Sequence, residues 1–256
     1  MADCATEAAR ESRLLGGRLR LLQPDAGYRV AIDPVLLAAA VPAQPGQSLL
    51  ELGCGSGAAS LCLLARVGGA QVTGLELNSE MATLARRSAE MNALPLSVVE
   101  GDLLRLPDQV AGRYDQVFMN PPYLAAGAAS PSSQPTRAAA NLEGAARLSH
   151  WIDAALSRLP RGGRLTLIHR ADRIDEILAL LHGRAGDLAV LPLRAYADRP
   201  AKRVIVTGRK DKGKPLTLLP DFILHDDGGC YSPAAQKVLR QGEAIDLLTP
   251  AQRSSL

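Results

Sequence analysis

The sequence predicts a doubly wound α/β fold, with a mostly parallel sheet that ends in an antiparallel C-terminal hairpin. Two observations predict the parallel core. Short apolar runs alternate with segments of helical periodicity from Ser48 to about Leu181, and the first of these runs ends in a glycine-rich turn. The hairpin is predicted by the turn signal Asp198-Arg199-Pro200, which separates two strand-like stretches at 188–196 and 203–207.

The elements follow in order along the chain. Strands are expected at 48–52, 71–76, 96–100, 114–119, 164–168, 188–196, 203–207 and 216–224. Helices are expected over 58–67, after the N-cap Asn78, over 148–159 and after a cap at Asp172. The helix over 148–159 has the clearest pattern, an unbroken apolar stripe of Leu148, Trp151, Ile152, Ala155, Leu156 and Leu159. The aperiodic segment 124–145, rich in small residues, is predicted to be a substrate lid.

Composition bounds the class of protein. Apolar residues make up 47% of the chain and charged residues 21%, which is typical of a soluble globular domain. We expect residues 1–13 to be a flexible leader and 14–256 to be a single domain in the cytoplasm. The four cysteines have no C-x-x-C spacing, so neither a metal site nor a disulfide framework is indicated. No membrane segment is expected, and nothing in the sequence implies an oligomer.

Positive charge is concentrated near the C-terminal hairpin. The net charge of the whole chain is +3. Between Arg194 and Lys214 eight bases stand against two acids, a net +6 that leaves the rest of the chain at −3. This basic stripe is either a footprint for phosphates or a solvated hairpin whose lysines protect a sheet edge.

The first expected strand closes with Glu51-Leu52-Gly53-Cys54-Gly55-Ser56-Gly57 and leads into a helix. Glycines in such a turn let the backbone approach a ligand without a Cβ in the way. The same loop also fits the dinucleotide pattern G-x-G-x-x-G/A, with Glu76 near the distance expected of a ribose-binding acid. At this point a nicotinamide-dependent oxidoreductase is an open alternative.

Two acids follow the next expected strands. Glu76 ends the second strand, where its carboxylate can accept both hydroxyls of a ribose, and Asp102 follows the third, where it can accept from an adenine amine. The carboxyl ends of successive parallel strands line the crevice where open α/β sheets bind ligands. Together with the glycine loop, the two acids therefore predict a nucleoside-containing cofactor.

The tetrapeptide Asn120-Pro121-Pro122-Tyr123 follows the fourth expected strand. An exocyclic amine on an aromatic ring or carbonyl is a poor nucleophile because its lone pair is delocalised. The Asn120 side-chain oxygen and the Pro121 carbonyl can accept both N–H bonds and favour a pyramidal nitrogen. Consecutive prolines stiffen the loop, and Tyr123 offers a face for stacking the planar group. This motif therefore predicts methylation of an amine. In a nicotinamide-dependent oxidoreductase the motif would have no function.

With these motifs placed, the chain resembles the Asn-Pro-Pro-Tyr branch of class I S-adenosylmethionine-dependent methyltransferases, which have a Rossmann-like fold. Within that branch it is most similar to the bacterial valine-tRNA (adenine-N6) methyltransferases. Residues 27–37 resemble the family's segment before the glycine loop, in which the acid, Asp33 here, borders the cofactor site. Residues 198–204, Leu216-Thr217 and Tyr231-Ser232 resemble its closing hairpin and tail.

The resemblance implies S-adenosylmethionine as cofactor, tRNA as partner and no metal. It implies methyl transfer to the N6 amine of an adenosine, with the one beside the anticodon of valine tRNA as the expected target. The implied cofactor residues are Asp33, Glu51, Gly53, Gly55, Gly57, Glu76, Asp102, Leu103 and Asn120, and the catalytic motif is Asn120, Pro121, Pro122 and Tyr123. Candidate RNA contacts are Arg137, Arg199, Lys202 and Arg203.

Other substrates remain open on the sequence alone. The same motif occurs in glutamine-N5 methyltransferases that act on proteins such as release factors, and in N6 or N2 methyltransferases of rRNA and DNA. A non-catalytic RNA-binding module with the same fold is a further alternative.

Overall fold

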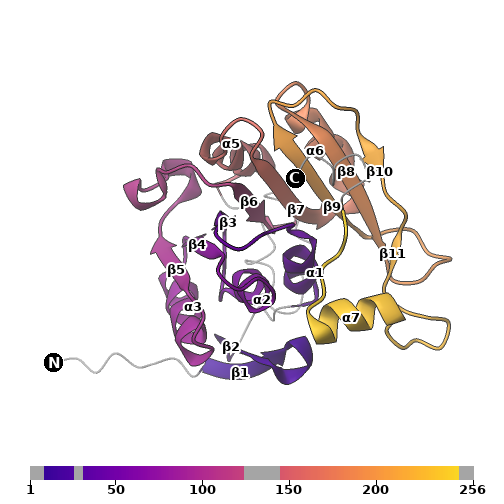
Figure 1. Cartoon of the computed structure of the whole chain (residues 1–256), viewed down its shortest axis with the longest axis horizontal. Helices are drawn as coiled ribbons and strands as arrows, with labels where there is room; N and C mark the ends of the chain where they lie inside the picture. Colours follow the sequence, from indigo (N-terminus) through magenta and orange to yellow (C-terminus); the bar gives the residue numbers. More distant parts are fainter. Residues whose placement is uncertain (1–8, 26–30, 124–144, 248–256) are drawn as a thin grey trace.

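The computed structural model describes residues 9–25, 31–123 and 145–247. Its centre is a nine-stranded sheet in the order β10-β8-β9-β7-β6-β3-β4-β5, with β11 also paired to β8 (Figure 1). The strands are β1 Ala9–Leu14, β2 Leu19–Pro24, β3 Ser48–Leu52, β4 Gln71–Glu76, β5 Leu96–Glu100, β6 Gln116–Met119, β7 Arg164–Arg170, β8 Ala185–Arg194, β9 Arg203–Lys210, β10 Thr217–Leu218 and β11 Phe222–Ile223. The helices are α1 Asp33–Ala40, α2 Ala58–Arg66, α3 Ser79–Met91, α5 Leu148–Arg158, α6 Ile174–Leu181 and α7 Pro233–Gln241.

The directions of the strands confirm the predicted fold class. Strand β3 pairs in parallel with both β4 and β6, and the parallel ladder continues to β5 on one side and β7 on the other. Strand β9 runs antiparallel to β7 and to β8, which is the predicted closing hairpin. The strands predicted at 48–52, 71–76 and 96–100 match β3, β4 and β5 residue for residue.

Successive side chains of the core strands enter two separate apolar clusters. On β3, Leu49 packs in the cluster that holds α1 and α2, whereas Leu50 packs in the cluster that holds α5 and α6. On β6, Phe118 packs in the first of these clusters and Val117 in the second. Because side chains alternate along a strand, continuous apolar runs are what a sheet covered on both faces requires.

The helix predicted over 148–159 is α5, and all six residues of its apolar stripe are buried. The prediction that Asp172 caps the next helix is wrong. Asp172 lies within a single 3-10 turn, Ala171–Arg173, where its carboxylate pairs with Arg170. Helix α6 then begins at Ile174 without a capping side chain.

The strand predicted at 216–224 is two short strands, β10 and β11. Pro220 lies between them, and a proline has no N–H with which to continue a ladder. Both short strands run parallel to β8, so the chain follows the outer edge of the sheet and pairs with it at two places instead of forming one full strand.

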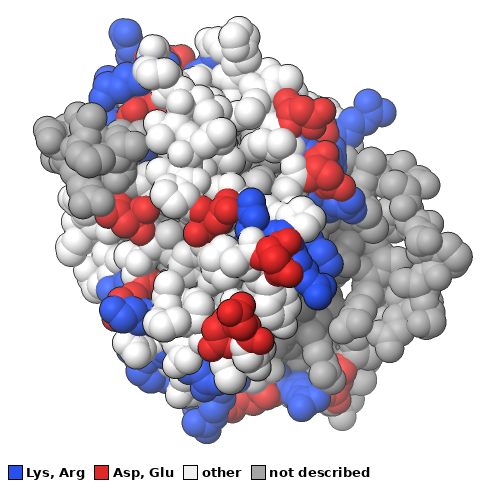
Figure 2. All heavy atoms as spheres, turned by 90° about the vertical axis from the view of Figure 1, so that its right-hand side faces the viewer, with Lys and Arg blue, Asp and Glu red and all other residues white. Residues whose placement is uncertain are grey.

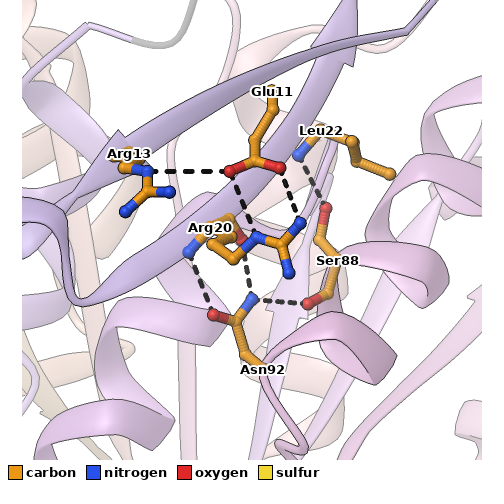
Figure 3. A network of polar contacts seen from close by, with 6 residues as sticks. All are labelled: Glu11, Arg13, Arg20, Leu22, Ser88 and Asn92. Atoms are coloured by element: carbon orange, nitrogen blue, oxygen red, sulfur yellow. Dashed lines mark hydrogen bonds and ion pairs between the residues drawn. The ribbon is translucent and has the colours of Figure 1, made fainter.

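The prediction of a flexible leader over 1–13 is wrong for residues 9–13, which belong to β1. This strand forms an antiparallel hairpin with β2. Two side chains of the α3 end hold the hairpin (Figure 3). Ser88 Oγ accepts from the Leu22 N–H at 2.9 Å, and Asn92 both accepts from the Arg20 N–H at 2.9 Å and donates to the Arg20 carbonyl at 2.6 Å. Residues 1–8 lie outside the described residues.

Most of the predicted lid, residues 124–144, also lies outside the described residues. Within the described ranges, no helix combines the length and the apolar character that crossing a bilayer requires.

We expect Asn92→Ala to loosen the hairpin from α3. The substitution removes two hydrogen bonds to the exposed Arg20 backbone, at a cost of about 0.5–1.5 kcal/mol. Denaturant unfolding and amide hydrogen exchange at Arg20 measure the loss. Arg13→Ala is the control, because the Arg13–Glu11 ion pair is exposed and such pairs contribute little. Equal stability of the two variants would contradict this role of Asn92.

Candidate functional site at the carboxyl edge of the sheet

The carboxyl ends of the parallel strands bring the predicted site residues to one edge of the sheet. Strands β3, β4, β5 and β6 end at Leu52, Glu76, Glu100 and Met119, with aligned registers. The chain leaves β3 toward β4 on one side, while β6 lies on the other side. In α/β sheets ligands bind at such a reversal of strand order, and the glycine loop and Asn120 follow the two adjacent strands β3 and β6 at this reversal.

The glycine loop is held by Glu76. The Gly55 N–H donates to Glu76 Oε2 at 2.7 Å, and the Cys54 N–H donates to the Leu75 carbonyl at 3.0 Å. The other carboxylate oxygen, Glu76 Oε1, accepts from the Asn78 N–H at 2.9 Å. A carboxylate has about four lone-pair sites, so these two bonds orient Glu76 and leave it able to accept from a ligand.

Trp151 supports the loop from beneath. Gly53 has φ +66°, and a Cβ built on it would lie 2.5 Å from Cη2 of the Trp151 indole. Only glycine fits this position, because both the backbone angle and the approach to the ring exclude a side chain. Sequence reasoning placed Trp151 in the α5 stripe without assigning it to the site. The signal that it offered was its being the single tryptophan of the chain.

Glu51 lies in the core rather than at the surface of the loop. It is 2% exposed, and its Oε2 accepts from the Ser60 N–H at 3.0 Å and from the Ser60 hydroxyl. Burial raises the pKa of Glu51 to about 8, because the charged form loses hydration. Its contacts within the chain therefore connect β3 to the first turns of α2, directly under the loop.

Asp102 and Leu103 follow β5 on the same edge. Asp102 caps the 3-10 turn Leu103–Arg105, and its Oδ1 accepts from the Leu104 N–H at 2.9 Å. The Gly101 N–H donates to the Glu76 carbonyl at 2.9 Å, which ties the ends of β5 and β4 together. Leu103 is half-buried and packs against the cluster that contains Trp151. The structure thus brings together Glu76, Asp102 and the glycine loop, as the sequence predicts.

The Asn-Pro-Pro-Tyr motif begins where the fully buried strand β6 ends. Asn120 Oδ1 is buried, and no donor reaches it from the described residues. A buried acceptor without a partner costs about 1–3 kcal/mol relative to a paired one. A buried acceptor in this state is able to accept the N–H of a bound amine, which is the role that the sequence predicts for Asn120.

Three predicted residues with different assigned roles meet at the end of the motif. Tyr123 donates its hydroxyl proton to Asp33 Oδ2 at 2.5 Å, and Arg203 Nε lies 3.0 Å from the same oxygen. The Arg203 guanidinium carbon is 4.3 Å from the centroid of the Tyr123 ring. Asp33 is the first residue of α1, and Arg203 is the first residue of β9. We call Asp33, Tyr123 and Arg203 the tyrosine clamp.

The basic stripe is not one surface. Because β9 runs from Arg203 at the motif edge to Lys210 at the opposite edge, Lys212 and Lys214 lie far from the motif along the strand. Several of its bases are engaged within the chain: Arg194 pairs with Asp221 at 2.8 Å, and Lys210 Nζ donates to the Leu156 carbonyl at 2.8 Å. On the side of β8, β10 and β11, acidic and basic side chains are interspersed among neutral ones (Figure 2).

Two predicted RNA contacts are exposed at the motif edge of the hairpin. Lys202 is exposed, and the exposed Arg199 lies with its guanidinium carbon 5.3 Å from the Tyr196 ring centroid. Tyr196 stacks on His225, and His225 on Tyr231, with centroid separations of 5.3 and 5.0 Å. Sequence reasoning missed this aromatic stack, because its members are far apart in the chain. Arg137 lies outside the described residues.

Comparisons with known proteins bear on this site. A family model described as a methyltransferase domain matches residues 49–131, the span from β3 through the Asn-Pro-Pro-Tyr motif. The tRNA1(Val) (adenine(37)-N6)-methyltransferase of Porphyromonas gingivalis is 30% identical over 230 residues, which cover 84% of this chain and 89% of that relative. The chain belongs to this methyltransferase family. The resemblance seen in the sequence is therefore confirmed, and the oxidoreductase alternative falls away.

Two further matches set the limits of the comparison. A putative protein N5-glutamine methyltransferase of Methanocaldococcus jannaschii is 32% identical over 97 residues, only 38% of this chain and 47% of that protein. A solved structure described as a predicted O-methyltransferase of Agrobacterium tumefaciens is 29% identical with a TM-score of 0.69 and covers 84% of this chain and 98% of that one. The chain is an S-adenosylmethionine-dependent methyltransferase with the Rossmann-like fold expected from its sequence.

We expect Gly53→Ala to lower the free energy of unfolding by about 2–4 kcal/mol. This is the sum of the cost of a left-handed backbone angle and the cost of steric overlap with Trp151. Gly46→Ala is the matched control. Gly46 has φ +84°, but no atom of the described residues outside its chain neighbours lies within 4 Å of its would-be Cβ, so only the backbone cost of about 1–2 kcal/mol applies. Urea unfolding and calorimetric binding of S-adenosylmethionine measure both. Equal destabilisation would show that Trp151 does not restrict the loop.

Glu51→Gln should change how stability depends on pH. In the wild type the pKa of Glu51 is about 8 in the folded chain and near 4.5 when unfolded. The contribution of protonated Glu51 to the stability of the fold is therefore full below about pH 4.5 and is lost as pH rises toward 8. Relative to the variant, the unfolding free energy should fall by about 1.4 kcal/mol per pH unit across this window. Urea unfolding at pH 5.5, 6.5 and 7.5 tests this, and parallel profiles of the two proteins would refute it.

Proposed function

We propose that this enzyme transfers the methyl group of S-adenosylmethionine to the exocyclic N6 amine of an adenosine in tRNA, namely the adenosine beside the anticodon of valine tRNA. The observation that carries the proposal is the buried Asn120 Oδ1, which has no donor within the described residues, directly before two prolines. The name and the extent of the P. gingivalis relative support the RNA substrate.

The cofactor would be held at the carboxyl edge of β3, β4 and β5. Glu76 would accept hydrogen bonds from the ribose hydroxyls and Asp102 from the adenine amine. The loop from Gly53 to Gly57 would contact the remaining part of the cofactor. Leu103 would add an apolar contact, and Glu51 would support the loop through Ser60. When bound, S-adenosylmethionine supplies an electrophilic methyl group on a sulfonium. The residues of this chain would orient the amine and hold the base.

Asn120 and Pro121 would prepare the amine. The Asn120 side-chain oxygen accepts one N–H and the Pro121 carbonyl the other, which favours a pyramidal nitrogen with its lone pair exposed. Two consecutive prolines fix the backbone, so both acceptors are oriented before the substrate arrives. Tyr123 stacks on the base, which has been unstacked from its loop at low cost because the loop is single-stranded. Neither acceptor is a base near neutral pH, so the extra proton leaves the product to solvent.

Arg199 and Lys202 are the proposed contacts to the RNA backbone. Both are exposed on the turn between β8 and β9, at the edge of the sheet that carries the motif. Few phosphate contacts imply a modest salt dependence, because each one contributes a slope near −0.7 to −0.9.

We expect Asn120→Ala to lower methyl transfer to unmodified valine tRNA by at least about a hundredfold, because one preorganised acceptor is lost. Calorimetric binding of S-adenosylmethionine should be largely retained. Arg161→Ala is the control, because Arg161 is an exposed residue at the opposite edge of the sheet and should leave both quantities unchanged. Parallel loss of turnover and of cofactor binding in Asn120→Ala would mean that Asn120 is misassigned.

A further inference from the structure

The tyrosine clamp joins three segments that are distant in the sequence. Arg203 is 170 residues from Asp33, and Tyr123 is 90 residues from it. The Asp33 side chain is 14% exposed and that of Arg203 is 33% exposed, so the ion pair between them is largely shielded from solvent. A second donor of Arg203, Nη1, is 3.1 Å from the Lys202 carbonyl.

We propose that Arg203 and Asp33 are positioning residues that fix the Tyr123 ring for the reaction, and that Arg203 does not contact the RNA backbone. The inference rests on the proposed function of Tyr123 as a stacking platform. It changes the role that the sequence predicts for Arg203, since a charge count does not distinguish a cation held by a carboxylate from one that faces solvent.

The prolines of the motif cannot orient the tyrosine ring by themselves. They restrict the backbone angles of residues 121 and 122, but the side-chain torsions of Tyr123 stay free to rotate. Ordering such a side chain on binding costs about 0.5–1.5 kcal/mol, which would be subtracted from the stacking energy. A ring that is already held avoids this cost and places the base at a defined distance from Asn120.

The contacts of Tyr123 hold its ring at several points. Asp33 fixes the hydroxyl end, and the Arg203 guanidinium covers ring atoms as a cation–π contact. His169 meets the ring edge-on, with a centroid distance of 5.4 Å and an interplanar angle of 81°. His169 is fully buried, and burial together with the nearby Arg173 lowers its pKa to about 4. At physiological pH His169 is therefore an uncharged side chain that packs against the edge of the Tyr123 ring.

The same contacts argue against a role of Arg203 in holding a phosphate. Arg203 Nε is engaged by Asp33 and its Nη1 by the Lys202 carbonyl, so a phosphate that used either nitrogen would displace a partner within the chain. Displacement from Asp33 would leave a shielded carboxylate beside an aromatic ring without its cation. Removing one partner of a shielded ion pair is costly. Arg199 and Lys202, which precede it on the same turn, are exposed and face no such cost.

The test compares Arg203→Ala and Arg203→Lys with Lys202→Ala on unmodified valine tRNA. We expect Arg203→Ala to lower kcat by between about tenfold and a hundredfold and to raise the tRNA Kd by no more than about tenfold, with the salt slope of binding unchanged. Arg203→Lys keeps the charge but not the planar guanidinium, and should restore part of kcat. Lys202→Ala should instead raise KM and reduce the salt slope by about one. Arg203→Ala with unchanged kcat, a weaker tRNA affinity and a reduced salt slope would overturn the proposal.

Two further variants guard against a general folding defect. Tyr123→Phe removes only the hydroxyl that joins Asp33, and it should lower kcat in a folded protein whose melting temperature falls no further than that of Arg203→Ala. Asp33→Ala combined with Arg203→Ala should be no slower than the slower single variant, because both substitutions release the same ring. Additive losses, or wild-type kcat in Tyr123→Phe, would contradict the clamp.

An activity-independent measurement separates this inference from the proposed function. In protein labelled with ring-13C tyrosine, the Tyr123 signal is identified by its absence from Tyr123→Phe. NMR relaxation should report a restrained ring in the wild type and a mobile one in folded Arg203→Ala. If the wild type does not methylate tRNA, the proposed function fails but the clamp is still tested. If the ring is equally restrained in both proteins, the clamp fails whatever the substrate.

Discussion

The parallel pairing of β3 with both β4 and β6 is the constraint on which the site depends. Parallel strands must be joined by crossings that return the chain to the same edge, so the segments after β3, β4, β5 and β6 all emerge together. The glycine loop, Glu76, Asp102 and Asn120 are separated by tens of residues in the chain. They meet because each follows the carboxyl end of one of these strands.

The site is stabilised from within the core as well as from its surface. Trp151 of α5 lies against Gly53 on one side of the sheet, and Glu51 reaches Ser60 of α2 under the same loop. The tyrosine clamp adds a third support, which links the start of α1 and the start of β9 to the motif. Segments outside the β3–β5 part of the sheet therefore contact the motif that we propose holds the reacting amine.

The sequence was sufficient to predict features that depend on local pattern. Strands β3, β4 and β5 were predicted residue for residue, because a sheet covered on both faces requires short continuous apolar runs. The glycine loop and the Asn-Pro-Pro-Tyr motif were recognisable because their chemistry depends on neighbouring residues. By contrast, β1 alternates little and is mostly polar, so it resembled a leader, although its backbone pairs with β2, which Asn92 holds.

Long-range contacts account for most of what the sequence did not predict. The reversal of direction in β9 divides the basic stripe between two edges, which a charge count along the chain cannot reveal. Arg203 looked like a candidate for phosphate because its partner Asp33 is 170 residues away. Trp151 followed the helical period of α5, and its being the single tryptophan did not indicate that its ring lies under Gly53.

The proposed activity is tested most directly by methyl transfer from labelled S-adenosylmethionine to unmodified valine tRNA, with release factor and duplex DNA assayed in parallel and the product nucleoside identified. We expect N6-methyladenosine in the tRNA and no label in the other two substrates. Label in the release factor alone would place a glutamine amide, rather than an adenine amine, between Asn120 and Tyr123 and would contradict the proposed substrate.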